Sequence, residues 1–156
     1  MKKVGIDFVS SLPSTNLSPL VTDVMRDNEF THAPVSNEGD SIGLCLGAYL
    51  GGKKPAFLAQ NSGLTLATYQ LLVSIHWFNG FPLLMIIDHV PGDFGDPSGW
   101  LFAGYGIQVP KMLDSFHVPY KIARDPETLE DDTIRAGRMA AGTRKPVALL
   151  LSGDRV

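Results

Sequence analysis

Short apolar runs alternate with longer helical patterns along the whole chain. The runs of strand length lie near residues 6–11, 32–35, 55–59, 82–87, 119–122 and 146–151, and the helical patterns lie near residues 18–28, 38–51, 62–78, 105–117 and 126–142. This alternation is typical of repeated βα units. Two of the runs, 82–87 and 147–151, are continuously apolar, as strands buried on both faces are. The pattern predicts an α/β domain with an open, mostly parallel six-stranded sheet and helices on both faces.

Capping residues agree with several of these boundaries. Ser18-Pro19 and Asp125-Pro126 each place a capping residue before a proline at the first helical position, and Gly142 stands where a C-terminal glycine is expected. Because no linker, repeat or low-complexity tract interrupts the pattern, we expect residues 1–156 to form a single domain.

Composition limits what the chain binds. The 156 residues are 44% hydrophobic and 19% charged, with a formal net charge of −3 and no basic run. Nucleic acid is therefore not expected as a partner, and small-molecule chemistry is favoured. The single cysteine, Cys45, lies in an apolar helical pattern and is predicted to be a core residue. With neither an apolar run of membrane-spanning length nor a secretory pattern at the start, we expect a cytoplasmic protein without a membrane partner.

The helical pattern over residues 38–51 begins with a carboxylate. Glu38 in the first turn would complement the helix dipole, which is the simplest interpretation. The residues that follow are apolar or small on every side, with glycines at 43, 47 and 51. Such a helix is predicted to be buried without a solvated face, and glycines four residues apart let another backbone approach closely. Glu38 is therefore predicted to stand at the mouth of a buried interface.

Open parallel sheets bind ligands beyond the carboxyl ends of their strands. Four loops are expected there: residues 12–16, 36–38, 60–63 and 88–99. The last is long and rich in glycine and proline, which predicts a lid or binding loop.

Single residues in these loops allow more than one role. His89 is a candidate for acid–base chemistry because it follows a strand directly, whereas His76, in an apolar helix, is expected to be structural. Ser62 is better explained as a helix cap than as a nucleophile. The loop aspartates, such as Asp88, either bind a cation or form turns, and turns are the commoner role. No phosphate-binding loop with a Gly-Lys-Ser/Thr ending and no pair of Cys or His at metal-ligand spacing is present.

Two motifs resemble a known family. Asn37-Glu38-Gly39-Asp40 is followed about twenty residues later by Gln60-Asn61-Ser62-Gly63, and then by the apolar run 82–87. In this order and at this spacing they resemble the pyrimidine-binding domain of thiamine-diphosphate-dependent decarboxylases, in particular sulfopyruvate decarboxylase alpha subunits and phosphonopyruvate decarboxylases. The resemblance covers nearly the whole chain.

The resemblance implies roles for particular residues. Glu38 would be the catalytic glutamate that hydrogen-bonds N1′ of the aminopyrimidine of thiamine diphosphate. The residues Gln60, Asn61, Ser62 and Gly63 would lie near the pyrimidine ring, and Pro13, Ser14, Asn16 and His89 would contribute to substrate binding. Burial supports the role of Glu38, because desolvation helps a carboxyl group to share a proton with a weakly basic ring nitrogen.

The other half of such an active site is missing. The family holds the diphosphate and Mg²⁺ through a Gly-Asp-Gly motif followed by asparagine in a different domain, and this sequence contains no such motif. The resemblance therefore implies a beta subunit that carries the diphosphate-binding domain and Mg²⁺, a hetero-oligomer, and a chain that is active only with that partner. No metal ligand is expected in the chain itself.

The sequence is compatible with several functions. The implied reaction is decarboxylation of a 2-oxo acid, with sulfopyruvate, which gives sulfoacetaldehyde and CO₂, as the leading substrate. Phosphonopyruvate and a 2-oxo acid with an uncharged tail are the alternatives, since residues 88–106 contain no Lys or Arg to bind a second anion. A non-catalytic flavodoxin-like binding module is the alternative from another class. A third alternative is a subunit that serves only in assembly and has lost catalysis. The presence of Glu38 argues against it.

Overall fold

A computed structural model describes residues 1–77, 80–90 and 99–152. Its sheet has six strands, all paired in parallel, in the order β2-β1-β3-β4-β6-β5. The strands are β1 (Phe8–Ser11), β2 (Thr31–Pro34), β3 (Pro55–Gln60), β4 (Leu83–Asp88), β5 (Tyr120–Ala123) and β6 (Pro146–Leu151). The predicted open parallel sheet is confirmed, and each strand lies within about two residues of its expected position.

The centre of the sheet follows from the two continuously apolar runs. All six residues of β4 and all six of β6 are buried, and the two strands pair with each other along their whole length. Strands with no polar face are stable only where helices cover both faces of the sheet. The apolar runs therefore occupy interior positions, while β2 and β5 form the edges.

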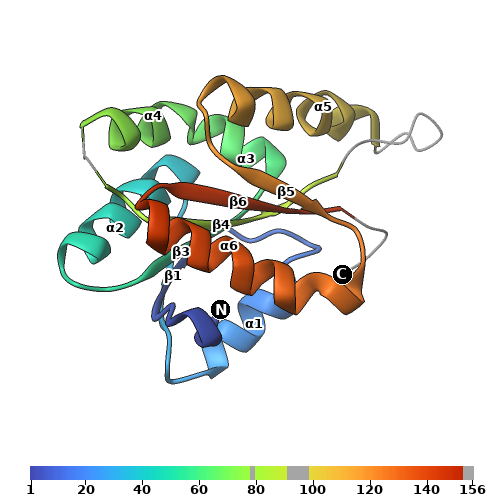
Figure 1. Cartoon of the computed structure of the whole chain (residues 1–156). Coiled ribbons are helices and arrows are strands. Elements are labelled where there is room, and N and C mark those ends of the chain that lie inside the picture. Colours follow the sequence, from blue (N-terminus) through green and yellow to red (C-terminus); the bar gives the residue numbers. More distant parts are fainter. Residues whose placement is uncertain (78–79, 91–98, 153–156) are drawn as a thin grey trace.

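Helices cover both faces (Figure 1). One layer consists of α2, α3, α4 and α5, and the other of α1 and α6, each packed on its own apolar cluster against the sheet. The helices are α1 (Ser18–Arg26), α2 (Glu38–Leu50), α3 (Asn61–Leu66), α4 (Thr68–Trp77), α5 (Gly99–Ser115) and α6 (Leu129–Thr143), with short 3₁₀-helices η1 (Lys2–Val4) and η2 (Pro126–Thr128).

Two helical predictions were wrong in extent. The single helix expected over 62–78 is two helices, α3 and α4, with a break at Ala67. The hydroxyls of Thr65 and Thr68 donate to the carbonyls of Ser62 (2.5 Å) and Leu64 (3.3 Å), and such bonds from threonine bend helices. The helix expected over 105–117 begins earlier, at Gly99.

Three of the four predicted caps were also wrong. Ser62 does not cap α3, because the capping residue is Gln60 and Ser62 lies inside the helix. The backbone already winds before Ser18, where the Val21 N–H donates to the Leu17 carbonyl, so Leu17 rather than Ser18 is the capping residue of α1. Helix α6 runs through Gly142, and its end is formed by Arg144 in the left-handed conformation (φ 55°). The cap at Asp125 is confirmed, because its carboxylate accepts a hydrogen bond from the Glu127 N–H at 2.9 Å.

The prediction that α2 has no solvated face was wrong for the single chain. Gly43, Leu44, Gly47 and Leu50 are exposed along one side of this helix, and a Cβ added at Gly43 or Gly47 would meet nothing within 4 Å. The side is apolar yet open to solvent. It is part of a larger surface on this helical layer, described below.

Candidate functional site

Glu38 is the first residue of α2, at the carboxyl edge of the sheet. Its position is set by Asn37, the extended capping residue, whose side-chain oxygen accepts a hydrogen bond from the Gly39 N–H at 2.8 Å. Glu38 is only 8% exposed. A carboxylate at a helix N-terminus gains from the dipole, but the dipole alone gives no reason to bury it.

Gly63 forms a hollow for the Glu38 side chain. A Cβ built on Gly63 would overlap the Glu38 carboxylate oxygen Oε1 and lie 2.7 Å from both Cδ and Cγ of Glu38. Any other residue at this position would therefore displace the carboxylate. The two predicted motifs, residues 37–40 and 60–63, meet in this contact.

The Glu38 carboxylate has no hydrogen bond or ion pair within the part of the chain that the structure describes. Although Glu38 is mostly buried, neither of its carboxylate oxygens is among the fully buried side-chain atoms that lack a partner in the described ranges. An acceptor at this edge of the sheet suits a ligand with a donor group.

A serine pair, Ser10 of β1 and Ser41 of α2, fixes the start of α2 to the sheet. The Ser10 hydroxyl donates to the Ala33 carbonyl (3.0 Å) and shares a hydrogen bond with the Ser41 hydroxyl (2.8 Å). Both serines are fully buried. This link between β1, β2 and α2 holds the first turn that carries Glu38, and sequence reasoning missed it because polar residues in an apolar run signal no particular contact.

The letters Gly39-Asp40-Ser41-Ile42-Gly43 match the G-x-S-x-G pattern of serine hydrolases. In those enzymes the serine stands on a sharp turn between strand and helix, with its hydroxyl exposed. Ser41 instead lies inside α2, is fully buried and is bonded to Ser10. The structure therefore gives no support to a nucleophilic role.

The 60–63 motif is partly structural. The side-chain oxygen of Asn61 accepts from the Ser62 N–H (2.9 Å), and its Nδ2 donates to the Val90 carbonyl (3.0 Å). Asn61 therefore joins the end of β3 to the segment that follows β4. Gln60 and Ser62 are half-buried beside it, and neither side chain forms a hydrogen bond with another described residue.

Asp88, the last residue of β4, organises the loop predicted to bind substrate. Its carboxylate accepts from the Ser14 hydroxyl (2.6 Å) and from the Asn16 side-chain amide (3.1 Å). Pro13 lies exposed in the same loop. Sequence reasoning assigned Asp88 to a turn or a cation. Its position could have indicated a structural role, because Asp88 is a charged residue at the carboxyl end of a strand that is otherwise apolar.

His89 is buried, and its ring is tied to helix α5. Its Nε2 donates to the Gly106 carbonyl at 2.8 Å, which leaves Nδ1 as an acceptor with no partner among the residues described. The predicted lid over residues 88–99 lies mostly outside the described residues, since 91–98 are not among them, as does the side chain of His76.

Cys45 is fully buried and is therefore a core residue, as predicted, and burial raises the pKa of its thiol to about 12. No group of three or more His, Cys, Asp or Glu able to hold a metal occurs among residues 1–77, 80–90 and 99–152. In the same ranges no helix is long and apolar enough to cross a membrane.

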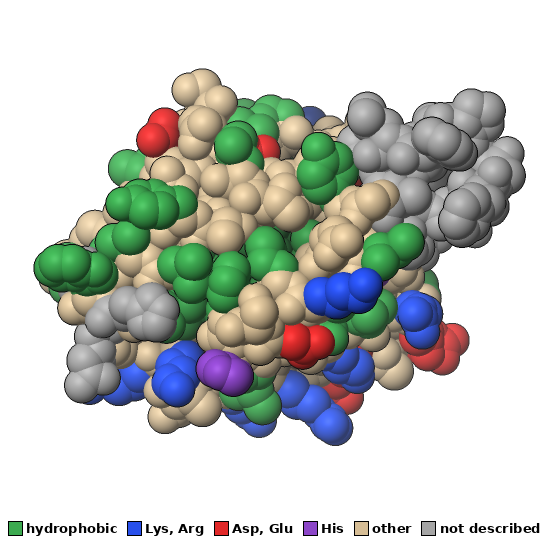
Figure 2. Space-filling model, turned by 90° about the horizontal axis from the view of Figure 1, so that it is seen from above, with side chains coloured by type: hydrophobic (Ala, Val, Ile, Leu, Met, Phe, Trp, Pro, Cys, Tyr) green, Lys and Arg blue, Asp and Glu red, His purple; other side chains and the backbone are tan. Residues whose placement is uncertain are grey.

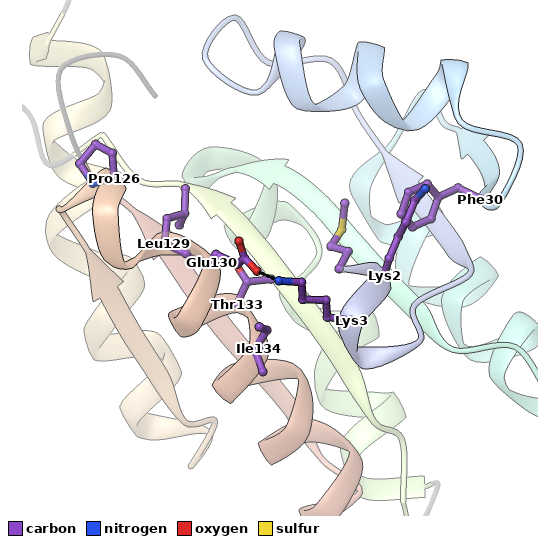
Figure 3. A pocket seen from close by; sticks show the side chains of 9 residues that line it. Lys2, Lys3, Phe30, Pro126, Leu129, Glu130, Thr133 and Ile134 are labelled. Atoms are coloured by element: carbon purple, nitrogen blue, oxygen red, sulfur yellow. Dashed lines mark hydrogen bonds and ion pairs between the residues drawn. The ribbon is translucent and has the colours of Figure 1, made fainter.

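A groove of about 530 Å³ lies on the opposite face of the sheet, between η1, Phe30 and α6 (Figure 3). Its charged groups already have partners, because Lys3 pairs with Glu130 and Lys2 pairs with Asp27 and Glu29. The groove is remote from Glu38 in the fold and offers no comparable free group.

The fold and this edge define an open parallel α/β domain that carries a mostly buried glutamate in a glycine hollow at the carboxyl ends of its strands. The same fold occurs in a solved structure, 2-oxoglutarate:ferredoxin oxidoreductase from Magnetococcus marinus with 2-oxoglutarate, coenzyme A and succinyl-CoA bound, which matches 96% of this chain and 26% of its own with a TM-score of 0.70 at 20% identity.

Sequence comparison identifies the family. The chain is 34% identical over 155 residues to sulfopyruvate decarboxylase subunit alpha of Methanococcus maripaludis, covering 94% of this chain and 86% of that one. It is 31% identical over 153 residues to the same subunit of Methanothermobacter thermautotrophicus, covering 97% and 90%. No protein-family model matches the chain. The chain belongs to the family of sulfopyruvate decarboxylase alpha subunits, which confirms the resemblance predicted from the two motifs.

Proposed function

We propose that this chain is the alpha subunit of a thiamine-diphosphate-dependent decarboxylase, with sulfopyruvate as its leading substrate. The observation that carries the proposal is the buried Glu38 carboxylate, held in the Gly63 hollow without a partner among the described residues, in a chain of this family.

The residues present suit the pyrimidine end of thiamine diphosphate. Glu38 offers a carboxylate acceptor in a site with little water, where it can share a proton with a ring nitrogen. Gln60 and Ser62 lie at the same edge of the sheet and offer further hydrogen-bonding groups. When bound, the cofactor supplies the electron sink that decarboxylation requires. The part of this chain is to bind the ring, orient it and keep a proton at the Glu38 carboxylate.

The exposed apolar surface supports a partner subunit. Along the α2–α5 layer, Leu44, Leu50, Leu66, Tyr69 and Trp77 are exposed, with Tyr69 at 73% and Trp77 at 80%. Figure 2 views this layer and shows hydrophobic side chains spread across it, while most of the charged groups lie along one margin. Large exposed apolar surfaces mark interaction sites. We assign this surface to the beta subunit, which would hold the diphosphate and Mg²⁺ and complete a hetero-oligomer.

A 2-oxo acid with an uncharged tail is the second candidate substrate. Residues 88–106, which follow the strand that ends at Asp88, contain no Lys or Arg. A sulfonate or phosphonate would then have to be recognised by His89 or by a residue of the partner. Phosphonopyruvate remains the alternative among anionic substrates.

The test is reconstitution. The chain is purified alone and together with the beta subunit, and CO₂ release from sulfopyruvate, phosphonopyruvate and an uncharged 2-oxo acid is measured with thiamine diphosphate and Mg²⁺. We expect turnover only from the complex. Full activity of the single chain would contradict the division of the site between subunits, and an inactive complex with every 2-oxo acid would contradict the proposed reaction.

A further inference from the structure

The Asp88 carboxylate sits where two distant parts of the chain meet. Asp88 ends β4 and is 5% exposed, while its two hydrogen-bond donors, Ser14 and Asn16, lie in the loop after β1. Strand β3 lies between β1 and β4 in the sheet. The loop must therefore cross the carboxyl end of β3, beside Gln60, to reach Asp88, since Gln60 is the neighbour of Asp88 in the register.

Both carboxylate oxygens are used. The Ser14 hydroxyl donates to Oδ2 and the Asn16 amide donates to Oδ1, and hydrogen bonds to a charged acceptor are shorter and stronger than neutral ones. Asp88 forms no ion pair within the described ranges. A buried carboxylate without a cation is unfavourable unless donors satisfy it, and here both donors come from one short loop. The loop conformation is thus tied to the charge of a single residue.

Neighbouring residues fix the other side of the same edge. The Asn61 side chain holds the Val90 carbonyl, and the His89 ring holds the Gly106 carbonyl of α5. The end of β4 therefore joins the β1 loop, the start of α3 and helix α5. A change at Asp88 would release only the first of these three.

We propose that Asp88 is a positioning residue that fixes the loop over residues 12–16 across the end of β3, so that Pro13, Ser14 and Asn16 are placed for substrate. Its effect on turnover rests on the proposed decarboxylase function. Without the bridge the loop would regain backbone freedom, and each substrate binding event would have to order it again. Loss of the Asp88 bridge should therefore raise KM more than it lowers kcat.

The test exchanges the two partners. Asn16→Asp places a second carboxylate against Asp88, and the like charges separate the loop from β4. Adding Asp88→Asn to that variant restores one amide and one carboxylate with their positions exchanged, while Ser14 can donate to the new amide oxygen. Asn28→Asp adds the same charge at an exposed site far from this edge and serves as the matched control.

Two measurements are made on the complex with its partner subunit. For Asn16→Asp we expect kcat/KM to fall about 10- to 100-fold, mainly through KM, with the double variant recovering most of the loss. Hydrogen exchange of the amides of residues 14–17 should become faster in Asn16→Asp and return in the double variant. Ser14→Ala, which removes one of the two donors, should show a smaller loss of the same kind.

Several results would overturn the proposal. They are unchanged exchange and kinetics in Asn16→Asp, a double variant that recovers neither, or faster exchange with kinetics equal to those of Asn28→Asp. A lowered melting temperature with KM unchanged would show a merely structural residue. A wild-type complex that decarboxylates no 2-oxo acid would overturn the proposed function and, with it, the positioning role, while the exchange data would still report whether Asp88 fixes the loop.

Discussion

Replacing Glu38 by glutamine separates a chemical role from a structural one. Glutamine keeps the size of the side chain, so it fits the hollow at Gly63, and it can still hydrogen-bond a ring nitrogen. It cannot share a proton with that nitrogen. General acid–base contributions are about 10²- to 10⁴-fold, so we expect kcat of the complex to fall by about that factor. Because the buried carboxylate has no partner among the described residues, its loss should leave the folding stability nearly unchanged.

The competing explanation makes a different prediction. If Glu38 only complements the dipole of α2, its loss should cost about 0.3–1 kcal/mol. For a domain of this size that lowers the melting temperature by roughly 1–4 °C. Asp40 provides the matched control, because it lies in the same first turn but is exposed. Asp40→Asn should lose the stabilising interaction with the helix dipole, so its melting temperature should fall while kcat is retained.

The assay is single-turnover decarboxylation by the reconstituted complex at saturating cofactor, together with melting curves of wild type, Glu38→Gln and Asp40→Asn. Normal turnover of Glu38→Gln, with a melting temperature lowered as much as that of Asp40→Asn, would refute the chemical role of Glu38. An equal loss of kcat in both variants would refute it as well.

Three further predictions concern single positions. Gly63→Ala should displace the Glu38 carboxylate and lower kcat/KM by about 10²-fold. It should also lower the free energy of unfolding by about 1–3 kcal/mol. Wild-type kinetics would contradict the need for a glycine at this position. Gly43→Ala should stabilise the isolated subunit by about 0.5–1 kcal/mol, since its Cβ meets nothing, yet weaken assembly measured by size-exclusion chromatography; unchanged assembly would argue against a partner on this face. The Cys45 thiol, with its pKa raised to about 12, should react with a thiol reagent at pH 8 only as fast as the chain unfolds. Because the folded state keeps that proton, the stability should fall from about pH 9 toward pH 12; rapid labelling of the folded chain would contradict its burial.

The sequence predicted the sheet well, because apolar runs and their lengths report burial directly. Glu38 and Gly63 were identified through a motif, but the reason for the glycine, a carboxylate pressed against it, became visible only in three dimensions. The break between α3 and α4 was missed because it depends on threonine hydroxyls that bond to backbone carbonyls. Periodicity carries no information about such bonds.

The role of Asp88 could not be predicted from sequence for a related reason. Ser14 and Asn16 lie more than seventy positions from Asp88, and only the strand order brings them together. The apolar character of α2 was predicted correctly, but the side of the helix left uncovered depends on how α2 packs against α4 and β3. The amino-acid composition of the helix could not predict which of its sides would be left uncovered.

The candidate site draws on only part of the chain. Ser14, Glu38, Gly63, Asp88 and His89 come from four consecutive βα units, whereas β5, α6 and β6 supply β4 with a neighbour and cover one face. Mutational tolerance should therefore be uneven. Residues 121–152 need only preserve apolar volume and helix or strand propensity, so a scan of all substitutions should find this segment limited by folding alone. Substitutions at positions 10–90 should be limited both by folding and by the chemistry of the site.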